Sequence, residues 1–156
     1  MTASQGVLAG QTGTMPGPMA VATKHLSFST RGDNDVHDLT DDVAAAVGES
    51  GIRNGTVTVF VPGSTAGITA IEYEPGMIRD LQEFLEKIAP ARGTYHHNHG
   101  GDSNGHAHVR SAFIGPSMAV PLIDGKLGLG TWQQIVLVDF DDRPRRREVT
   151  VQIVGQ

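Results

Sequence analysis

The apolar residues of this chain occur in short runs, and this feature constrains its fold most. The longest uninterrupted apolar runs are four or five residues, as in Ile135–Val138, and turn-forming Gly, Pro, Asn and Asp residues separate them. A membrane-spanning helix needs roughly 20 consecutive apolar residues. The sequence therefore predicts short strands and helices in a globular domain, and no transmembrane segment.

Residue periodicity gives the order of these elements. β-branched and aromatic residues bounded by turn signals predict strands, whereas apolar residues three and four apart, with charges between them, predict amphipathic helices. We expect strands over residues 20–30, 55–62, 66–73, 106–114, 118–123, 131–140 and 147–154, and helices over residues 40–51 and 77–90. This order favours a single α+β domain with an antiparallel, β-sandwich-like sheet and about two helices packed on one side.

Length and charge narrow the classes of protein further. A chain of 156 residues fits one domain. We assign residues 1–18 to a flexible tail, because they lack charge and an apolar periodicity, and residues 19–156 to the domain. The tail has no signal-peptide pattern, so a cytoplasmic location is expected. A net charge of −5 argues against a general nucleic-acid binder.

The strand predicted over residues 131–140 has two apolar faces. Trp132, Val136 and Phe140 alternate with Ile135 and Leu137. Helices of the same chain can cover the second face, or another subunit can cover it. The second alternative predicts a homo-oligomer.

The histidines are concentrated in one stretch. Five of the seven lie between His96 and His108, and the chain has no cysteine, so a metal site would need His, carboxylate or water ligands. If residues 106–114 form a strand, His106, His108 and Arg110 share a face, and His97 can approach them across the glycine-rich loop. Such a cluster suits either a divalent metal, zinc or magnesium, or an anionic substrate such as a phosphate.

Other motifs are less informative or absent. The zinc-protease spacing His-Glu-x-x-His and a phosphate-binding Gly-x-x-x-x-Gly-Lys loop are both missing. Residues 63–67 can act as an anion-binding loop or as a simple hairpin turn. Arg147 shares a strand face with apolar residues, so it can reach the edge of a pocket, whereas the neighbouring arginines suit a solvated turn.

Eight short motifs in a fixed order carry a resemblance to a known family. The chain resembles the YjbQ-like family, also described as secondary thiamine-phosphate synthases, over roughly residues 24–156. The motifs are Gly63-Ser64-Thr65-Ala66-Gly67-Ile68-Thr69, Glu72-Tyr73-Glu74-Pro75-Gly76, Tyr95-His96-His97, Gly101-Asp102-x-Asn104, Ala107-His108, Gly115-Pro116-Ser117, Leu129-Gly130-Thr131-Trp132-Gln133 and Arg145-x-Arg147.

The resemblance implies a compact α+β fold, a homotrimer with the pocket near subunit contacts, and a synthase activity. That activity joins a hydroxymethylpyrimidine diphosphate to a thiazole phosphate and releases pyrophosphate. The implied catalytic residues are His97, His108 and Glu72, and the same two histidines are the implied metal ligands. The implied substrate-binding residues are Ser64, Thr65, Asn104, Ser117, Trp132, Gln133 and Arg147. Arg110 is added to this set because the predicted strand places it on the face of His106 and His108.

Two classes of function therefore remain after the sequence analysis. One is an enzyme that acts on a small phosphorylated heterocycle, in which arginines neutralise phosphate charge and histidines transfer protons or hold a metal. The other is a histidine-dependent metal-binding protein or a metal-assisted hydrolase.

Overall fold

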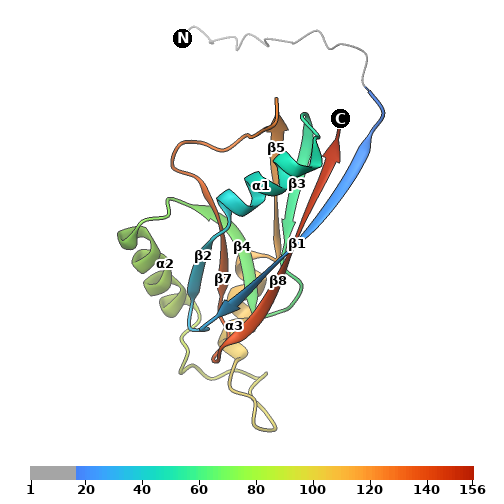
Figure 1. Cartoon of the computed structure of the whole chain (residues 1–156). Helices are drawn as coiled ribbons and strands as arrows, with labels where there is room; N and C mark the ends of the chain where they lie inside the picture. The colour runs from blue at the N-terminus through green and yellow to red at the C-terminus, as the bar shows by residue number, and fades with distance from the viewer. Residues whose placement is uncertain (1–16) are drawn as a thin grey trace, which may run out of the picture.

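Residues 17–156 of the chain are described by a computed structural model (Figure 1). Most of the tail assigned to residues 1–18 lies outside the described residues. The elements are β1 (Ala20–Thr30), β2 (Asp35–Asp38), α1 (Thr40–Ser50), β3 (Gly55–Phe60), β4 (Ala66–Ile71), α2 (Pro75–Ile88), α3 (Gly105–Ile114), β5 (Ser117–Ile123), β6 (Lys126–Leu127), β7 (Gln134–Asp139) and β8 (Arg145–Gly155).

Two antiparallel sheets form the body of the domain. The larger sheet has the strand order β1-β8-β3-β5-β6, and the smaller has the order β2-β7-β4. The main core lies between them and includes Val59, Ile68, Ile135 and Val151, all at most 1% exposed. Helix α1 contributes Val43 and Val47 to this core. The expected α+β fold with antiparallel sheets is confirmed.

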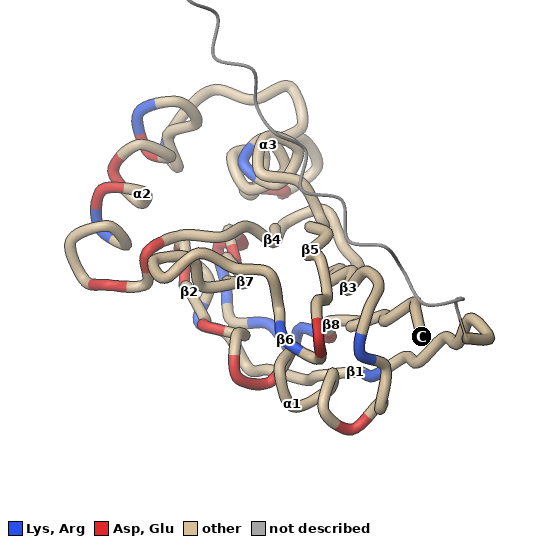
Figure 2. Tube along the Cα trace, turned by 90° about the horizontal axis from the view of Figure 1, so that it is seen from above, with Lys and Arg blue, Asp and Glu red and all other residues tan. Residues whose placement is uncertain are grey.

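The central strand β7 separates two cores. Ile135 and Leu137 face the core between the sheets, whereas Val136, Val138 and Phe140 face a second core that α2 and α3 cover. Figure 2 shows α2 and α3 on one side of the sheets and α1 on the other. Elements of the same chain thus cover both apolar faces of β7, so the two-sided pattern does not call for a second subunit.

The sequence prediction of a strand over residues 106–114 is wrong, because this segment is helix α3. The domain therefore has three helices within residues 17–156, not about two. Ala107 and Ile114 of α3 pack on the second core, and their spacing of seven residues places both on one face of a helix but on opposite faces of a strand. None of the three helices is long and apolar enough to cross a membrane.

Helix α2 begins where the sequence predicts an amphipathic helix, with a boundary set by Pro75. Pro75 occupies the first turn, and the side chain of Glu74 accepts hydrogen bonds from the backbone N–H groups of Gly76 and Met77. Leu85 is fully buried, and Leu81 packs beside it. The loop that follows α2, residues 89–104, leads to α3 and carries His96, His97 and His99.

Candidate functional site

His97 and His108 lie against each other. Their ring centroids are 4.2 Å apart, with an angle of 47° between the ring planes. His97 comes from the turn after α2, where the backbone N–H of His99 donates to the carbonyl of His97, and His108 comes from the first half of α3. The structure thus brings together the two histidines that the resemblance to the YjbQ-like family implies.

Tight packing of α3 on β4 fixes the position of His108. A Cβ atom added to Gly67 of β4 would lie 2.8 Å from Cγ2 of Ile114, so only glycine permits this approach. The hydroxyl of Ser111 donates to the carbonyl of Ala66 over 2.6 Å, and the N–H of Ile68 donates to the carbonyl of Gly115 over 3.0 Å. Gly67 of the Gly63–Thr69 motif therefore has a structural role next to the site.

The histidine pair lines a cavity of about 430 Å³, which we call the histidine cavity. Apolar atoms form most of its wall, so the cavity suits a flat, partly apolar ring. Its lining residues are Thr94, Tyr95, His96, His97, Gly105, His108, Val109 and Ala112.

Two physical effects keep His108 neutral at physiological pH. Burial lowers the pKa of the His108 imidazole below its usual value, and the neighbouring His97 lowers it further, although the charges of Asp141 and Asp102 act in the opposite direction. A neutral imidazole both donates and accepts a hydrogen bond. His108 is therefore able to donate and to accept a hydrogen bond at the cavity wall.

Arg110 does not join the histidine pair. Residues two positions apart point to roughly opposite sides of a helix, so the common face of His106, His108 and Arg110 that the strand prediction required does not exist. The Arg110 guanidinium is buried and donates to Glu86, to the carbonyl of Ala89 and to Asn34. It links α3 to α2 and has no contact with the histidine cavity.

His106 is also turned away from the pair. It is almost fully buried, its ring centroid lies 6.4 Å from that of Tyr95, and its Nδ1 atom has no hydrogen-bond partner among the described residues. Burial lowers the pKa of His106, and the nearby positive charge of Arg110 lowers it further. His106 is thus a neutral histidine of the interior.

Arg147 and Thr65 belong to a buried ionic network at the end of β7. The Arg147 guanidinium donates to both carboxylate oxygens of Asp139 at 2.7 Å and to the Thr65 hydroxyl at 2.8 Å. The Thr65 hydroxyl donates to Asp141 at 3.0 Å, and Arg145 donates to the same carboxylate at 2.7 Å. Arg147 and Thr65, which belong to the predicted substrate-binding set, therefore form their hydrogen bonds with other groups of the protein.

Three other residues of the predicted set lie at the opposite end of the smaller sheet. In the β4–β7 pair, Ala66 opposes Asp139 and Ile71 opposes Gln134, so Glu72, which follows β4, and Trp132 and Gln133, which precede β7, share an end. A six-residue strand spans roughly 20 Å. Glu72 is exposed, Trp132 is 70% exposed, and Gln133 accepts a hydrogen bond from the backbone of Gly130. Within one chain, these three do not meet the histidine pair.

Ser64 and Ser117 are exposed and lie outside the histidine cavity. Ser64 is in the turn between β3 and β4, and Ser117 begins β5 opposite Phe60.

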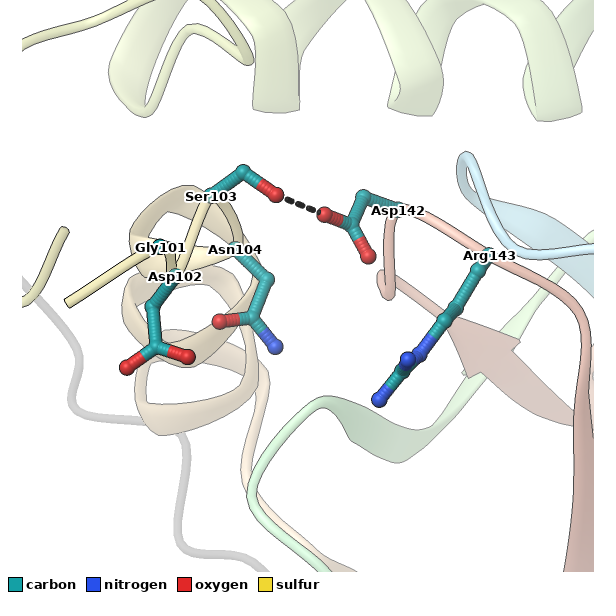
Figure 3. A pocket seen from close by; sticks show the side chains of 6 residues that line it. All are labelled: Gly101, Asp102, Ser103, Asn104, Asp142 and Arg143. Carbon is teal, nitrogen blue, oxygen red and sulfur yellow. Dashed lines mark hydrogen bonds between the residues drawn. The ribbon is translucent and has the colours of Figure 1, made fainter. Parts of the chain in front are cut away.

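A second cavity lies between the end of the loop that precedes α3 and the turn between β7 and β8 (Figure 3). Its volume is about 280 Å³, and we call it the Asn104 cavity. It contains Asn104 of the predicted set and also Arg143, which the sequence analysis placed among the arginines of a solvated turn. Its lining residues are Gly101, Asp102, Ser103, Asn104, Asp142 and Arg143.

The residues around the histidine pair do not form a complete metal site. Structural zinc sites use four ligands, and catalytic sites use three protein ligands plus water. No group of three or more His, Asp or Glu suited to a metal ion occurs in residues 17–156. Two imidazoles alone do not fit a tightly held zinc or magnesium ion.

Comparison with known proteins gives a consistent result. The family model described as "UPF0047 protein YjbQ-like" matches residues 24–156. A UPF0047 protein of Methanothermobacter thermautotrophicus is 36% identical over 138 residues, which cover 88% of this chain and 95% of that protein. A UPF0047 protein of Archaeoglobus fulgidus is 40% identical over 127 residues, covering 81% and 97%.

Solved structures agree with the sequence matches. A crystal structure of a YbjQ-like protein of unknown function from Sulfolobus solfataricus P2 superimposes with a TM-score of 0.86 at 37% identity, covering 89% of this chain and all of that one. A hypothetical protein from Aeropyrum pernix K1 gives a TM-score of 0.81 at 34% identity, covering 86% and 99%.

Proposed function

Because the chain belongs to the UPF0047 YjbQ-like family, we propose that it is an enzyme acting on a small phosphorylated heterocycle, with thiamine-phosphate synthesis as its reaction. The contact between His97 and His108 in the wall of a largely apolar cavity carries this proposal. Such a cavity takes the ring of the substrate, and the imidazoles supply proton transfer where the ring binds.

The two imidazoles act as one proton-transfer unit. Protonation of one disfavours protonation of the other, since like charges repel, and this repulsion lowers the pKa of His108. A neutral His108 imidazole has one ring nitrogen that donates a hydrogen bond and one that accepts a proton.

The proposed reaction balances without another reactant. The bond between the pyrimidine methylene carbon and the diphosphate oxygen breaks, and the thiazole nitrogen forms a new bond to that carbon. Pyrophosphate leaves with the electron pair of the broken bond, and the proton of the histidine pair stabilises the leaving charge.

The alternative is a metal-binding protein or a metal-assisted hydrolase built on His97 and His108. The incomplete ligand set disfavours it. Metal analysis of the purified protein is the direct test. Stoichiometric zinc that is lost from both the His97→Gln and His108→Gln variants would favour this alternative over the acid–base role.

We further propose that the active assembly is a homotrimer in which the pocket lies near a subunit contact. The separation of Glu72, Trp132 and Gln133 from the histidine pair supports this arrangement, because a second protomer is able to bring them to the pocket. The high exposure of Trp132 in the single chain is consistent with burial against a partner.

The synthase assay with three matched histidine variants tests the proposed function. We expect the wild-type protein to form thiamine phosphate and pyrophosphate, and His97→Gln and His108→Gln to lower the rate by about 100-fold or more, the usual range for a lost acid or base. His25→Gln, on the exposed outer face of β1, is the control and should retain full activity.

Two results would defeat the proposal. The first is absence of product with the folded wild-type protein, and the second is equal activity of all three variants. Thermal unfolding of each variant verifies that a loss of rate does not reflect a loss of fold.

A further inference from the structure

The guanidinium of Arg143 lies at the Asn104 cavity without an ion-pair or side-chain hydrogen-bond partner among residues 17–156. Figure 3 shows this guanidinium and the amide of Asn104 turned toward the same space. Asn104 precedes α3, and its side chain makes no capping hydrogen bond. Two groups that donate hydrogen bonds thus face one cavity with their donors unused.

Two carboxylates, those of Asp102 and Asp142, also line this cavity. Asp142 accepts a hydrogen bond from the hydroxyl of Ser103. Asp102 lies 3.9 Å from Nδ1 of His99, and its carboxylate points away from Arg143 in Figure 3. Neither forms an ion pair with Arg143, so the N–H donors of the guanidinium are available to a ligand.

The arginines that the sequence analysis selected for phosphate binding are not available. Arg110 is paired with Glu86, and Arg147 is paired with Asp139 and Asp141. Both side chains are at least nine-tenths buried. An anionic ligand group near the histidine pair needs a different cation, and Arg143 lines the Asn104 cavity.

Asn104 lines one cavity and the next residue, Gly105, lines the other, so both cavities reach the N-terminal end of α3. One cavity is mainly apolar with two imidazoles, and the other is polar with a guanidinium and an amide. A ligand with a ring and a charged substituent suits these two cavities, because the ring fits the apolar one and the charged substituent fits the polar one.

We propose that Arg143 and Asn104 form the subsite for the phosphate or diphosphate group of a ligand whose ring occupies the histidine cavity. This inference rests on the proposed function and names a binding residue that the family resemblance did not supply. The planar guanidinium binds two phosphate oxygens at once, and the amide N–H of Asn104 donates to a third.

Calorimetric titration with inorganic pyrophosphate tests the subsite. We expect Arg143→Gln to weaken binding by about tenfold or more, because a charge-assisted pair of hydrogen bonds is lost. Arg143→Lys keeps the positive charge but lacks the planar guanidinium. Its affinity for pyrophosphate should therefore lie between those of the wild type and Arg143→Gln. Asn104→Asp places a negative charge opposite the guanidinium and should also weaken binding.

Arg79→Gln is the matched control. Arg79 is an exposed arginine of α2 that lines neither cavity, so removing its charge changes the net charge equally without touching the subsite. Equal affinity of wild type and Arg143→Gln would overturn the inference. An equal loss in Arg79→Gln would overturn it as well, since it would show attraction by overall charge only.

The synthase assay separates this inference from the proposed function. A protein that binds pyrophosphate through Arg143 but forms no thiamine phosphate keeps the subsite and refutes the synthase reaction. A protein that forms thiamine phosphate at the same rate and KM with Arg143→Gln keeps the reaction and refutes the subsite.

Discussion

The guanidinium Nη2 atom of Arg110 lies 2.6 Å from a carboxylate oxygen of Glu86, and the two partners differ greatly in exposure. The Arg110 side chain is 2% exposed and the Glu86 side chain is 52% exposed. The same guanidinium donates to the buried carbonyl of Ala89 and to Asn34. Most of its hydrogen-bonding capacity therefore serves groups other than Glu86.

This asymmetry predicts unequal effects of removing the two partners. Arg110→Met should lower the free energy of unfolding by about 2–4 kcal/mol, because buried acceptors lose their donor. Glu86→Gln should lower it by less, because the Glu86 side chain is half exposed and glutamine keeps an oxygen acceptor for the guanidinium. Urea denaturation of both variants measures the difference, and equal losses would contradict the prediction.

The contact between the imidazoles predicts a coupled titration. The pKa of His108 should be below the usual value for histidine in the wild-type protein, because of burial and of His97. In His97→Asn one of these causes is absent, so the pKa of His108 should rise toward its usual value. NMR titration of the imidazole C–H signals measures this change. An unchanged pKa would show that the rings are not in contact in solution.

Buried ionisable groups predict two acid transitions in stability. The pKa of His106 is lowered, so its contribution is fully present above the usual histidine pKa of about 6.5 and is lost as the pH falls through the value in the folded protein. Burial alone would raise the pKa of Asp141, but hydrogen bonds from Arg145, Thr65 and Asp142 lower it to about 2. Its contribution is therefore lost at lower pH, between about 4 and 2.

Unfolding free energies measured from pH 8 to pH 3 distinguish these contributions. His106→Gln should reduce the loss of stability below pH 6.5, and the part that comes from His108, whose pKa is also lowered, should remain. A profile for His106→Gln that still falls between pH 6.5 and pH 5 as the wild type does would contradict the assignment.

The proposed homotrimer predicts a mass in solution of three times the 16.5 kDa chain. Light scattering at micromolar concentration measures it, and a mass near 16.5 kDa would refute the assembly. If the pocket is shared, mixing His108→Gln with Trp132→Ala protomers should restore about one quarter of wild-type activity, since a cyclic trimer forms intact sites between unlike protomers. No recovery from mixed trimers would place the whole site in one chain.

The sequence predicts strands and helices well where the hydrophobic periodicity and the turn-forming residues indicate the same boundaries. β1 and α1 have the predicted boundaries almost residue for residue. Asp124-Gly125, a dipeptide that favours two-residue hairpin turns, lies between β5 and β6 with positive φ at both positions. Gly51 ends α1 in the left-handed conformation, as a C-terminal glycine predicts.

Helix α3 was missed because its buried face is polar. The buried residues of α3 include His106, Arg110 and Ser111. A prediction from apolar periodicity assigns such polar residues to the surface. The spacing of Ala107, Ser111 and Ile114 fits a helix, but only after Ser111 is known to be buried. The partners that make this burial possible, such as Glu86 and Ala66, are distant in sequence.

The same reason limits the prediction of the site. The motifs select His97 and His108, yet the contact between their rings depends on the turn at residues 95–99 and on α3, neither of which was predicted. Arg147 was expected at a pocket edge because its strand position was known, whereas its pairing with Asp139 requires the β7–β8 connection to fold back. Internal charge pairs of this kind follow from tertiary structure alone.

Strand β7 has both faces buried, and this makes the domain one cooperative unit despite its two sheets and two cores. Because both cores include residues of this strand, we expect them to unfold together. The amide protons of Ile135 through Val138 should exchange with solvent only when the whole domain unfolds. A substitution that destabilises the core between the sheets should therefore also lower the stability of α3. Substitutions far from His108 can change its position in this way, because both cores share β7.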